Sequence, residues 1–258
     1  MNYLLFSILS LFIVGCSSGV NINLFSVDED KEFGKKVMTE IESDPKFKIM
    51  DSVQNQEVYS YIYKIRNKIL ESGNVKHKDN FDWRIRIIQD DSTLNAFCTP
   101  GGYIYVYTGL LKFLDSEDQL AGVMGHEIAH ADLRHSTRQM TEMFGIQLIL
   151  ELVAGDSKSI KEITSGLIGL TFSRSHEKEA DEQSVNYLCP TSYNAAGGAG
   201  FFEKLIKKGD SNNPPVFLST HPDPGNRVEK FNSIKAEKGC TGTETYATEF
   251  KRIVSKLP

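Results

Sequence analysis

The sequence predicts an α+β fold, mainly helical, with a small antiparallel sheet. Apolar residues recur at helical spacing in the first part of the chain and again throughout its second half. Between these regions lies a short stretch rich in β-branched and aromatic residues, with a Pro-Gly-Gly turn inside it. The order of helices, small sheet and many helices favours one α+β domain over two separate domains.

The first part of the chain predicts two helices followed by the sheet. Phe33, Val37 and Ile41 recur every four residues, which places them on one helical stripe. The same spacing recurs in the next segment, and the sheet follows where the pattern changes to partial alternation. The expected elements are helices over Asp28–Glu42 and Val53–Leu70 and strands within Trp83–Ile88 and Ala96–Tyr107.

From Ser116 onward the sequence predicts helices almost throughout. Ser116-Glu117-Asp118-Gln119 is typical of an N-cap box, so we expect a helix from there to about Ser136. A turn-rich stretch over Asp210–Asn226 separates the main helices from the last two. The further helices are expected near 138–153, 157–171, 173–188, 194–208, 225–237 and 243–256.

The charge balance excludes one broad class of partner. The 258 residues include 29 Lys and Arg against 34 Asp and Glu, a formal net charge of −5. Nucleic-acid-binding domains carry a basic excess, so we expect no nucleic-acid partner. Hydrophobic residues make up 40% of the chain and charged residues 24%, which is the balance of a globular protein and not of a disordered one. We therefore expect function from a local site.

The N-terminus is typical of an exported protein. Tyr3–Gly15 is an uncharged apolar run, too short for a transmembrane helix, which needs about 20 residues, and suited to the core of a signal peptide. Cys16, with Gly15 before it, resembles the cysteine of a bacterial lipobox, which is lipidated and becomes the new N-terminus. A plain secretory signal is the alternative. We expect a lipoprotein signal peptide over 1–15, a lipid-anchor linker over 16–27 and one domain over 28–258.

The residue after the lipobox cysteine bears on the membrane that holds the anchor. Ser17 is not the Asp that tends to retain such proteins at the inner membrane. We therefore expect the protein in the bacterial cell envelope, attached through its lipid to the outer membrane and facing the periplasm.

Three further cysteines follow Cys16, and an exported compartment permits disulfides. Cys189 and Cys240 lie in loop-like sequence and are the favoured pair. Cys98 lies in a strand-like run, where we expect it to act as a small buried hydrophobic residue.

The segment His126-Glu127-Ile128-Ala129-His130 is the main candidate for a functional site. Two histidines four residues apart on a helix share one face, so both imidazoles can bind one Zn²⁺. Glu127, next to the first ligand, is placed to take a proton from a zinc-bound water and pass it to a leaving amine. Apolar neighbours such as Val123 and Met124 fit a buried helix.

A catalytic zinc needs a third protein ligand. A third histidine on the same segment is not available, because Leu133 and Ser136 occupy the positions where the extended pattern has Gly and His. His135 is predicted to point away from the ligand face, as a surface residue or one behind the ligands. The remaining candidates are carboxylates further along the chain.

Two downstream carboxylates are candidates for the third ligand. Glu151 lies in an apolar helical pattern, whereas Glu177 and Asp181 lie one helical turn apart on the same face. Glu177 can then bind the metal while Asp181 accepts the distal N–H of a ligand histidine. Glu179 is expected to be solvated, and the same segment could also be a plain charged helix.

Three segments together resemble the HtpX-like and CAAX-prenyl-endopeptidase-like zinc metallopeptidases, particularly their soluble periplasmic lipoprotein members. They are His126–His130, the segment from Phe172 to Asp181, and the run from Asn95 to Leu110 with its Pro-Gly-Gly turn. The resemblance covers roughly residues 30–235. It implies a zincin-type metalloprotease domain in which an edge strand lies above the zinc helix. It also implies one Zn²⁺ held by His126, His130 and Glu177, with Glu127 as general base.

The membrane-embedded relatives carry long apolar spans near the zinc helix. Phe144–Val153 is too short for such a span. Processing of prenylated peptides within a membrane is therefore not expected of this chain.

The strand before the zinc helix is the candidate substrate-binding element. An added strand grips any peptide through main-chain hydrogen bonds, while pockets select its side chains. By the resemblance, Asn95-Ala96-Phe97 is the edge strand that does this; the alternative is a strand that serves only the core.

His221 and Arg227 also match the resemblance, which has a His-Pro loop followed by an arginine. Either side chain could stabilise the oxyanion of the tetrahedral intermediate. His221 could instead cover the open zinc position as part of a lid, since Asp210–Asn226 holds four of the eight prolines. A third reading is a simple turn, in which Arg227 pairs with an acid near the site such as Glu179. His77, between two lysines, is expected to be solvated, and His176 has no assigned role.

The leading hypothesis is a zinc-dependent endopeptidase of the bacterial cell envelope. Its expected substrates are unfolded or misassembled proteins, outer-membrane proteins among them, as the resemblance suggests. The alternative is a chaperone or assembly-type binding module for outer-membrane proteins, in which zinc holds the fold and proteolysis is slight. A purely structural lipoprotein is disfavoured by the intact Glu127.

Overall fold

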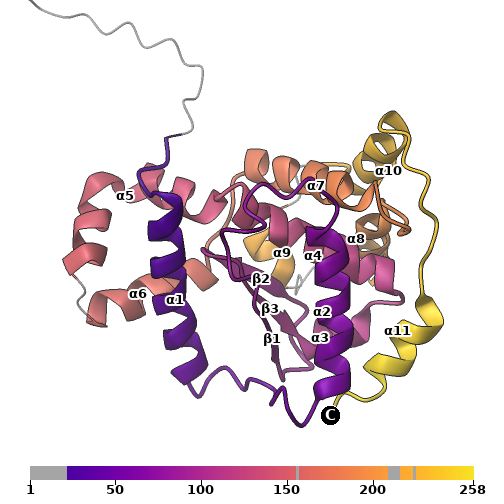
Figure 1. Cartoon of the computed structure of the whole chain (residues 1–258), viewed down its shortest axis with the longest axis horizontal. Helices are drawn as coiled ribbons and strands as arrows, with labels where there is room; N and C mark the ends of the chain where they lie inside the picture. The colour runs from indigo at the N-terminus through magenta and orange to yellow at the C-terminus, as the bar shows by residue number, and fades with distance from the viewer. Residues whose placement is uncertain (1–21, 155–156, 209–215, 223–224) are drawn as a thin grey trace, which may run out of the picture.

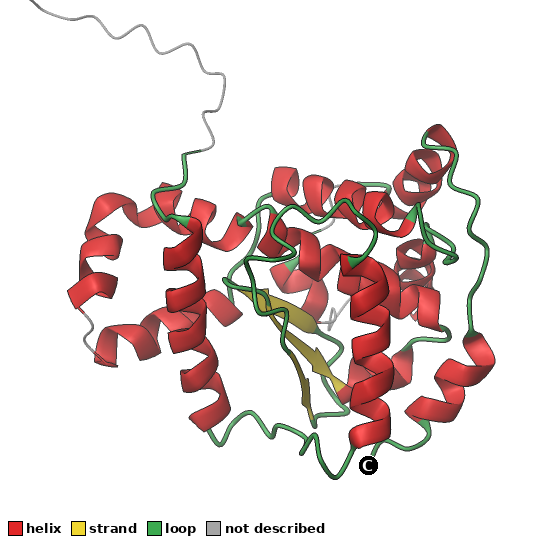
Figure 2. Ribbon diagram, viewed as in Figure 1, coloured by secondary structure: helices red, strands yellow, loops and turns green. Residues whose placement is uncertain are grey.

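The computed structural model describes residues 22–154, 157–208, 216–222 and 225–258. The predicted signal peptide, Cys16 and the first part of the linker lie outside these residues. Figures 1 and 2 show a mainly helical molecule with a small sheet at its centre, which confirms the predicted fold class. The helices are α1 (Val27–Ser43), α2 (Gln56–Leu70), α3 (Thr108–Phe113), α4 (Glu117–Asp132), α5 (His135–Ala154), α6 (Ser157–Ile168), α7 (Arg174–Leu188), α8 (Gly197–Lys208), α9 (Val216–Thr220), α10 (Arg227–Glu237) and α11 (Ala247–Val254), and the strands are β1 (Ile85–Ile88), β2 (Ala96–Thr99) and β3 (Tyr103–Tyr107).

The sheet is mixed, so the prediction of a purely antiparallel sheet is wrong in one of its two pairings. The strand order is β1-β3-β2, with β2 antiparallel and β1 parallel to β3. The turn at Gly101 and Gly102, both at positive φ, joins β2 and β3 as a hairpin. The link after β1 crosses the end of β3, so β2 runs back along the far side of β3. This crossing leaves β3 in the centre and β2 at the edge of the sheet.

Each face of the sheet has its own hydrophobic core. One face packs against α2, α4, α7 and the C-terminal helices, and it includes Ile85, Ile104 and Val106. The other face packs against α1 and α6, with Phe97 and Tyr105 stacked at 4.7 Å between ring centres. Figure 1 shows α1, α5 and α6 together on one side of the sheet. The helix with the His-Glu-x-x-His pattern, α4, therefore lies on the opposite side from α1 and α6.

The N-terminal segment joins the domain earlier than predicted. Asn23 Nδ2 donates to Thr137 Oγ1 over 3.0 Å, and the Leu24 N–H donates to Thr141 Oγ1 over 3.2 Å. Phe25 is buried and stacks on Phe33. These contacts fasten residues 23–25, which fall within the stretch predicted as a linker, to α1 and α5.

Two short helices were not expected from the sequence. α3 follows β3 directly, and α9 lies inside the stretch predicted to be turn-rich. Residues 210–215 and 223–224 of that stretch, with Pro214, Pro215 and Pro224, lie outside the described residues. None of the helices in the described ranges has the length and apolar character needed to cross a membrane.

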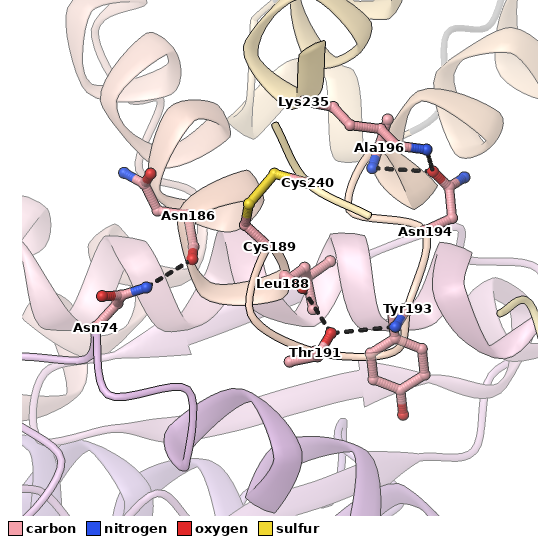
Figure 3. Close-up of a disulfide and its surroundings, with 10 residues drawn as sticks. All are labelled: Asn74, Asn186, Leu188, Cys189, Thr191, Tyr193, Asn194, Ala196, Lys235 and Cys240. Carbon is pink, nitrogen blue, oxygen red and sulfur yellow. Dashed lines mark hydrogen bonds between the residues drawn. A yellow bond between two sulfur atoms is a disulfide. The ribbon is translucent and has the colours of Figure 1, made fainter. Parts of the chain in front are cut away.

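A disulfide joins Cys189 to Cys240, the pair that the sequence favoured. Figure 3 shows it linking the end of α7 to the segment after α10. The two Cα atoms are 4.8 Å apart and 51 positions apart in the chain. Among the described residues Cys98 is the free cysteine; it is half-buried and packs against the core, where burial raises the pKa of its thiol.

Candidate metal centre

The central helix α4 carries His126, Glu127 and His130 on buried positions. Ser116 is its N-cap residue, but the predicted capping box is not formed, because Ser116 Oγ donates to Asp118 Oδ1 over 2.5 Å. Glu117 in the first turn is buried and accepts hydrogen bonds from the hydroxyls of Tyr61 and Tyr193. These contacts fix the start of the helix, and its 3.6-residue period then places both histidines on one face.

Helix α7 brings Glu177 and Asp181 to the same place. Ser173 caps its start by accepting the His176 N–H. α7 packs closely along α4, with Ser184 Oγ donating to the Gly122 carbonyl over 2.8 Å. Glu177 and Asp181, one turn apart, are both buried and both face α4.

The structure gathers four possible metal ligands in one buried cluster: His126, His130, Glu177 and His221. One donor atom from each lies within 4.8 Å of the others. The two Nε2 atoms of His126 and His130 are 3.0 Å apart, and each is within 3.4 Å of a Glu177 carboxylate oxygen. His221 Nδ1 lies 3.1 Å from Glu177 Oε1. Two of these residues come from α4, one from α7, and His221 directly follows α9.

The cluster has the chemistry of a metal site. Glu177 Oε2 and both carboxylate oxygens of Glu127 are buried and lack a hydrogen-bond donor within the described part of the chain. Buried carboxylate oxygens without donors are costly in a folded protein. Imidazole nitrogens with a carboxylate are a ligand set that suits Zn²⁺. A cation at this point would bind acceptor oxygens that the described part of the protein leaves without a hydrogen-bond partner.

Asp181 fixes the tautomer of His126. The Nδ1–H of His126 donates to Asp181 Oδ1 over 2.9 Å, which leaves Nε2 as the ring nitrogen that faces the cluster. Arg227 holds Asp181 in turn, with Nε donating to Oδ2 over 2.9 Å and Nη2 to Oδ1 over 2.5 Å. Arg227 is itself buried, and its guanidinium lies 4.0 Å from the centre of the Phe202 ring. Arg227 therefore pairs with Asp181, and not with Glu179 as one reading of the sequence had it.

His135 lies behind the candidate ligand His130, which is one of the two places that the sequence left open for it, and not at the surface. The predicted helix continued to about Ser136. Instead α4 ends at Asp132, and Arg134 adopts a positive φ of 59° before α5 begins at His135. The Arg134 side chain is held in this turn by Asp30, whose Oδ2 accepts from Nε over 2.5 Å. The turn brings His135 Nδ1 to 3.0 Å from His130 Nδ1.

The environment of His135 also fixes the tautomer of His130. Burial lowers the pKa of His135 to about 4, so its ring is neutral at pH 7. Its Nε2–H donates to Glu179 Oε2 over 3.3 Å, which makes Nδ1 an acceptor for the Nδ1–H of His130. The Nε2 of His130 is then free of a proton and faces the cluster. Both candidate histidine ligands thus direct Nε2 to the same point.

Two neighbours of His135 also differ from expectation. Glu179 is part-buried and not simply solvated: it accepts from His135 and from Arg138 Nη1, and these bonds lower its pKa to about 2. His176 stacks on His135 at 4.4 Å between ring centres. Phe172 stacks on the ring of His130 at 4.0 Å. These aromatic contacts help to hold the rings of His130 and His135 in place.

The charges of the cluster are arranged around buried carboxylates. Burial raises the pKa of Glu127, the carboxyl next to His126. Burial would raise the pKa of Glu177 as well, but the surrounding histidines, His126 first, hold it far below its usual range. Burial opposes the charged form of His126, yet Glu177 and Asp181 raise its pKa to about 9, while burial keeps the pKa of His130 well below its usual range. A negative centre at Glu177 therefore attracts positive charge to this point.

His77 is buried, which contradicts the prediction that it is solvated. Its backbone N–H donates to Asp132 Oδ1 over 2.7 Å, and its Nδ1 lies 2.8 Å from the Asp132 carbonyl oxygen. Tyr187 also donates to Asp132, over 2.7 Å. Asp132, at the end of α4, therefore binds both the loop that holds His77 and, through Tyr187, helix α7.

The strand that the sequence predicted to bind substrate, β2, lies beside α4, the helix that carries His126 and His130. β2 is an edge strand and packs against α4. Asn95 immediately precedes β2, and Ala96 and Phe97 are its first two residues. All three are buried, Ala96 against the core that includes α4 and Phe97 in the core beneath α1 and α6.

Comparison with known proteins bears on this arrangement. The sequence profile of peptidase family M48 matches residues 56–235, a segment that contains α4, α7, α9 and all four residues of the cluster. The chain belongs to peptidase family M48. The resemblance to HtpX-like zinc metallopeptidases is therefore confirmed, since they are the same family.

Relatives of this M48 chain include bacterial and mitochondrial proteases. It is 30% identical over 220 residues to the putative beta-barrel assembly-enhancing protease of Vibrio cholerae, covering 79% of this chain and 43% of that protein. It is 26% identical over 223 residues to the mitochondrial metalloendopeptidase OMA1 of Schizosaccharomyces pombe, covering 84% and 64%. The beta-barrel assembly-enhancing protease of Escherichia coli is 31% identical over 157 residues, covering 55% and 32%. The matched part is thus less than two thirds of each relative's length.

Proposed function

We propose that this M48 chain is a zinc-dependent endopeptidase in which His126, His130 and Glu177 hold one Zn²⁺ and Glu127 is the general base. The observation that supports this most directly is the buried cluster itself, with its donor atoms within 4.8 Å of one another. Zinc bound there would supply a Lewis acid that polarises the substrate carbonyl and lowers the pKa of the attacking water. Proton transfer, orientation of the ligands and control of access are then the work of the protein's own side chains.

Glu127 is the residue that moves protons in this proposal. Its carboxylate is buried, and neither of its oxygens has a hydrogen-bond donor among the described residues. An unengaged carboxylate can accept the proton of the attacking water and deliver it to the leaving amine, since burial raises its pKa toward the working range of a base. Peptide-bond cleavage then needs no second acid.

Asp181 and Arg227 act as positioning residues in this proposal. Asp181 orients His126 through Nδ1, and Arg227 fixes Asp181 with two hydrogen bonds. Because Arg227 binds Asp181 twice and its Nη2 also lies 3.3 Å from Glu177 Oε2, we assign its guanidinium to support of the ligands in preference to the oxyanion. Such partners commonly contribute 10- to 100-fold, approximately, to metal affinity or activity.

His221 is the residue proposed to control access. It is buried in the cluster, with Nδ1 3.1 Å from Glu177 Oε1 and Nε2 3.6 Å from Glu127 Oε1. From this position it would compete with substrate and water for the space between Glu127 and Glu177. We therefore favour the lid over the oxyanion role, and the two differ in the sign of a rate change given in the Discussion.

The substrate is proposed to bind as a strand beside β2, along Asn95-Ala96-Phe97, because β2 is the one of the two edge strands that lies against α4. Substrates would be unfolded or misassembled proteins of the bacterial envelope, outer-membrane proteins among them. The printed names of the Vibrio cholerae and Escherichia coli relatives, which refer to beta-barrel assembly, support this class. Lipidation at Cys16, with attachment to the outer membrane on its periplasmic side, would place the site among such proteins.

The test uses the mature chain with and without a chelator, beside Glu127→Gln. Wild type should bind one zinc per chain and cleave unfolded envelope proteins, and the chelator should abolish cleavage. Glu127→Gln should keep zinc and fold but lose hydrolysis, because the ligands remain and the base does not. Cleavage at the wild-type rate by Glu127→Gln would refute the mechanism. Binding of unfolded substrate without cleavage by wild type would support the chaperone-type module instead.

The ligand set is tested by metal analysis of three variants. His126→Ala, His130→Ala and Glu177→Ala should each lose zinc. Full zinc in Glu177→Ala would remove it as a ligand and favour Glu151, whose side chain lies outside the described part of the structure.

A further inference from the structure

A cavity of about 690 Å³ lies on the side of the sheet covered by α1 and α6. Its size is within the range of roughly 300–1,000 Å³ that is typical of ligand pockets. Apolar side chains from four elements form much of its wall: Ile41, Phe47, Ile88, Tyr107 and Ile168. Charged residues of both signs, Lys46 and Asp44 among them, also line it, so its charge does not select one sign of ligand.

The cavity adjoins the candidate metal centre. Thr220 and Thr171 line it, and each directly precedes a residue of the centre, His221 and Phe172. The Phe172 N–H donates to the Thr220 carbonyl over 3.1 Å, which joins these two segments. The Phe217 N–H donates to the Leu94 carbonyl over 3.3 Å, which joins α9 to the start of β2. The cavity therefore adjoins the start of the predicted substrate strand and the two segments that lead to Phe172 and His221.

The hydrogen-bond pattern of β2 shows which side chains of an added strand would reach the cavity. The Tyr107 N–H donates to the Asn95 carbonyl over 3.1 Å, so the backbone of Asn95 faces β3. Because successive residues of a strand face opposite edges, the polar backbone groups of Ala96 and Cys98 face the open edge. A strand paired there would direct every second side chain to the face of the sheet that bears Phe97 and the cavity.

The wall of the cavity also contains unsatisfied polar groups. Asn95 Oδ1 and Thr164 Oγ1 are buried and have no hydrogen-bond partner among the residues that the structure describes. Both residues line the cavity. A buried polar atom without a partner costs about 1–3 kcal/mol. A ligand that brings a neutral donor and acceptor into a mainly apolar pocket would recover this cost.

We propose that this cavity is a side-chain subsite for substrate, and that it prefers tyrosine. The proposal rests on the proposed endopeptidase function and adds its specificity. An aromatic ring fits the apolar wall. A phenol hydroxyl would donate to Asn95 Oδ1 and accept from Thr164 Oγ1 once these two side chains rotate toward the cavity, since both atoms are buried in the structure. The wall carries charges of both signs, so it favours neither an acidic nor a basic side chain over the other. The subsite serves a residue close to the scissile bond, since the cavity adjoins His221.

The experiment measures kcat/KM of the zinc-loaded chain for fluorogenic peptides that carry Tyr, Phe, Ala, Asp or Lys at each position around the cleaved bond. One position should prefer Tyr to Ala strongly, and Tyr to Phe by roughly five- to tenfold, the factor of about one net hydrogen bond. Equal rates for Tyr and Ala at every position would overturn the proposal.

Variants of α6 connect the preference to the cavity. Thr164→Val removes the hydroxyl at constant shape and should reduce the ratio of Tyr to Phe while retaining the ratio of Phe to Ala. Ser165→Trp, from an exposed position on the cavity wall, should fill the space and lower the ratio of Tyr to Ala at least about tenfold. The control is Leu170→Phe, which lies outside this cavity and lines a separate pocket between α5 and α6. Unchanged ratios in both cavity variants would overturn the proposal.

A second measurement separates this proposal from the proposed function. If the zinc-loaded chain cleaves no peptide, the endopeptidase function fails, and peptide binding to Glu127→Gln then tests the subsite alone. Tighter binding of the Tyr peptide than of the Ala peptide, reduced by Ser165→Trp, would support the cavity as a tyrosine site. Equal binding of the two peptides would refute it.

Discussion

At the scale of single residues, the two candidate histidine ligands are oriented by different groups. His126 donates its Nδ1 proton to a carboxylate, Asp181. His130 donates to another imidazole, His135, whose own proton is held by Glu179. A carboxylate partner is the common arrangement behind a metal-bound histidine. The neutral imidazole partner makes the tautomer of His130 depend on a second hydrogen bond further from the cluster.

We expect His135→Ala to lower zinc affinity by roughly 10- to 100-fold, the usual effect of removing such a partner. The reason is that His130 then loses the acceptor that keeps its proton on Nδ1. Zinc affinity is measured by competition with a chromogenic chelator. His176→Ala is the control, because His176 stacks on His135 but is not among the residues within hydrogen-bond distance of His130. Equal loss in both variants would show a general packing effect in place of tautomer control.

Mutation of His221 separates its two predicted roles by the sign of the effect. As a lid, His221 occupies space between Glu127 and Glu177, so His221→Ala should raise basal proteolysis, with self-cleavage, at unchanged zinc content. As an oxyanion donor, its loss should lower kcat by roughly 10²–10³. Initial rates on an unfolded protein, with zinc measured in parallel, distinguish the two. An unchanged rate would leave His221 as a turn residue.

The parts of the site that follow from local spacing could be predicted from the sequence. The pairs His126 with His130 and Glu177 with Asp181 are each four residues apart, and a helix puts such residues together whatever surrounds it. The partnership of Arg227 with Asp181 joins elements 46 positions apart, for which the sequence pattern holds no signal. His135 could have been found only by recognising that the helix ends before it.

At the scale of elements, small residues allow the central helix to approach its neighbours closely. A Cβ built on Gly122 would lie 2.2 Å from the Gly198 backbone nitrogen, at the start of α8. One built on Gly125 would lie 2.8 Å from Ser184 Oγ, on α7. Since α7 carries Glu177 and α4 carries both histidines, these close approaches set the distance across which the cluster is assembled.

We expect Gly122→Ala to destabilise the fold by roughly 1–3 kcal/mol, the usual cost of overpacking. The added methyl would meet backbone atoms, which cannot rotate away. Gly166→Ala is the matched control, because it is also helical but has no atom within 4 Å of the built Cβ. It should stabilise by roughly 0.5–1 kcal/mol through helix propensity. Chemical denaturation of both variants checks this; equal stability of Gly122→Ala and wild type would show that α8 shifts freely.

The elements that the sequence failed to predict depend on contacts between distant segments. The parallel pairing of β1 with β3 depends on the link between β1 and β2, which crosses the end of β3. The alternation of apolar and polar residues within each strand does not contain that information. The end of α4 depends on Asp30, which lies in the first helix and holds Arg134 in the turn. Buried contacts at long sequence separation therefore decide these features, while periodicity decided the helices themselves.

At the scale of the whole molecule, each of the two hydrophobic cores contains buried tyrosines. Burial raises the pKa of Tyr105 and Tyr107 on one face of the sheet, Tyr107 to about 12. It also raises the pKa of Tyr61, Tyr187 and Tyr193 in the other core. Each of these phenols must stay protonated in the folded state.

Stability is therefore expected to fall at alkaline pH. Because the folded pKa of these tyrosines is above the unfolded value near 10, their contribution is complete below about pH 10 and is lost as pH rises beyond it. The unfolding temperature should drop steeply between about pH 10 and pH 12. Tyrosinate absorbance of the native protein should stay below that of the denatured protein at the same pH. Equal absorbance in the two states near pH 11 would contradict this account.

The disulfide between Cys189 and Cys240 closes the chain between them into a covalent ring, and α8, α9 and α10 are part of that ring. His221 and Arg227 are both members of this ring, whereas the two histidines and Glu177 are outside it. A single cut of the backbone inside the ring leaves two pieces that stay attached through sulfur. The protein would then migrate as one band on a non-reducing gel and as two bands after reduction. Self-cleavage near His221 would therefore produce a nicked molecule whose two pieces do not separate. His221 would then lie close to a new chain end while its piece stays attached to the rest of the protein.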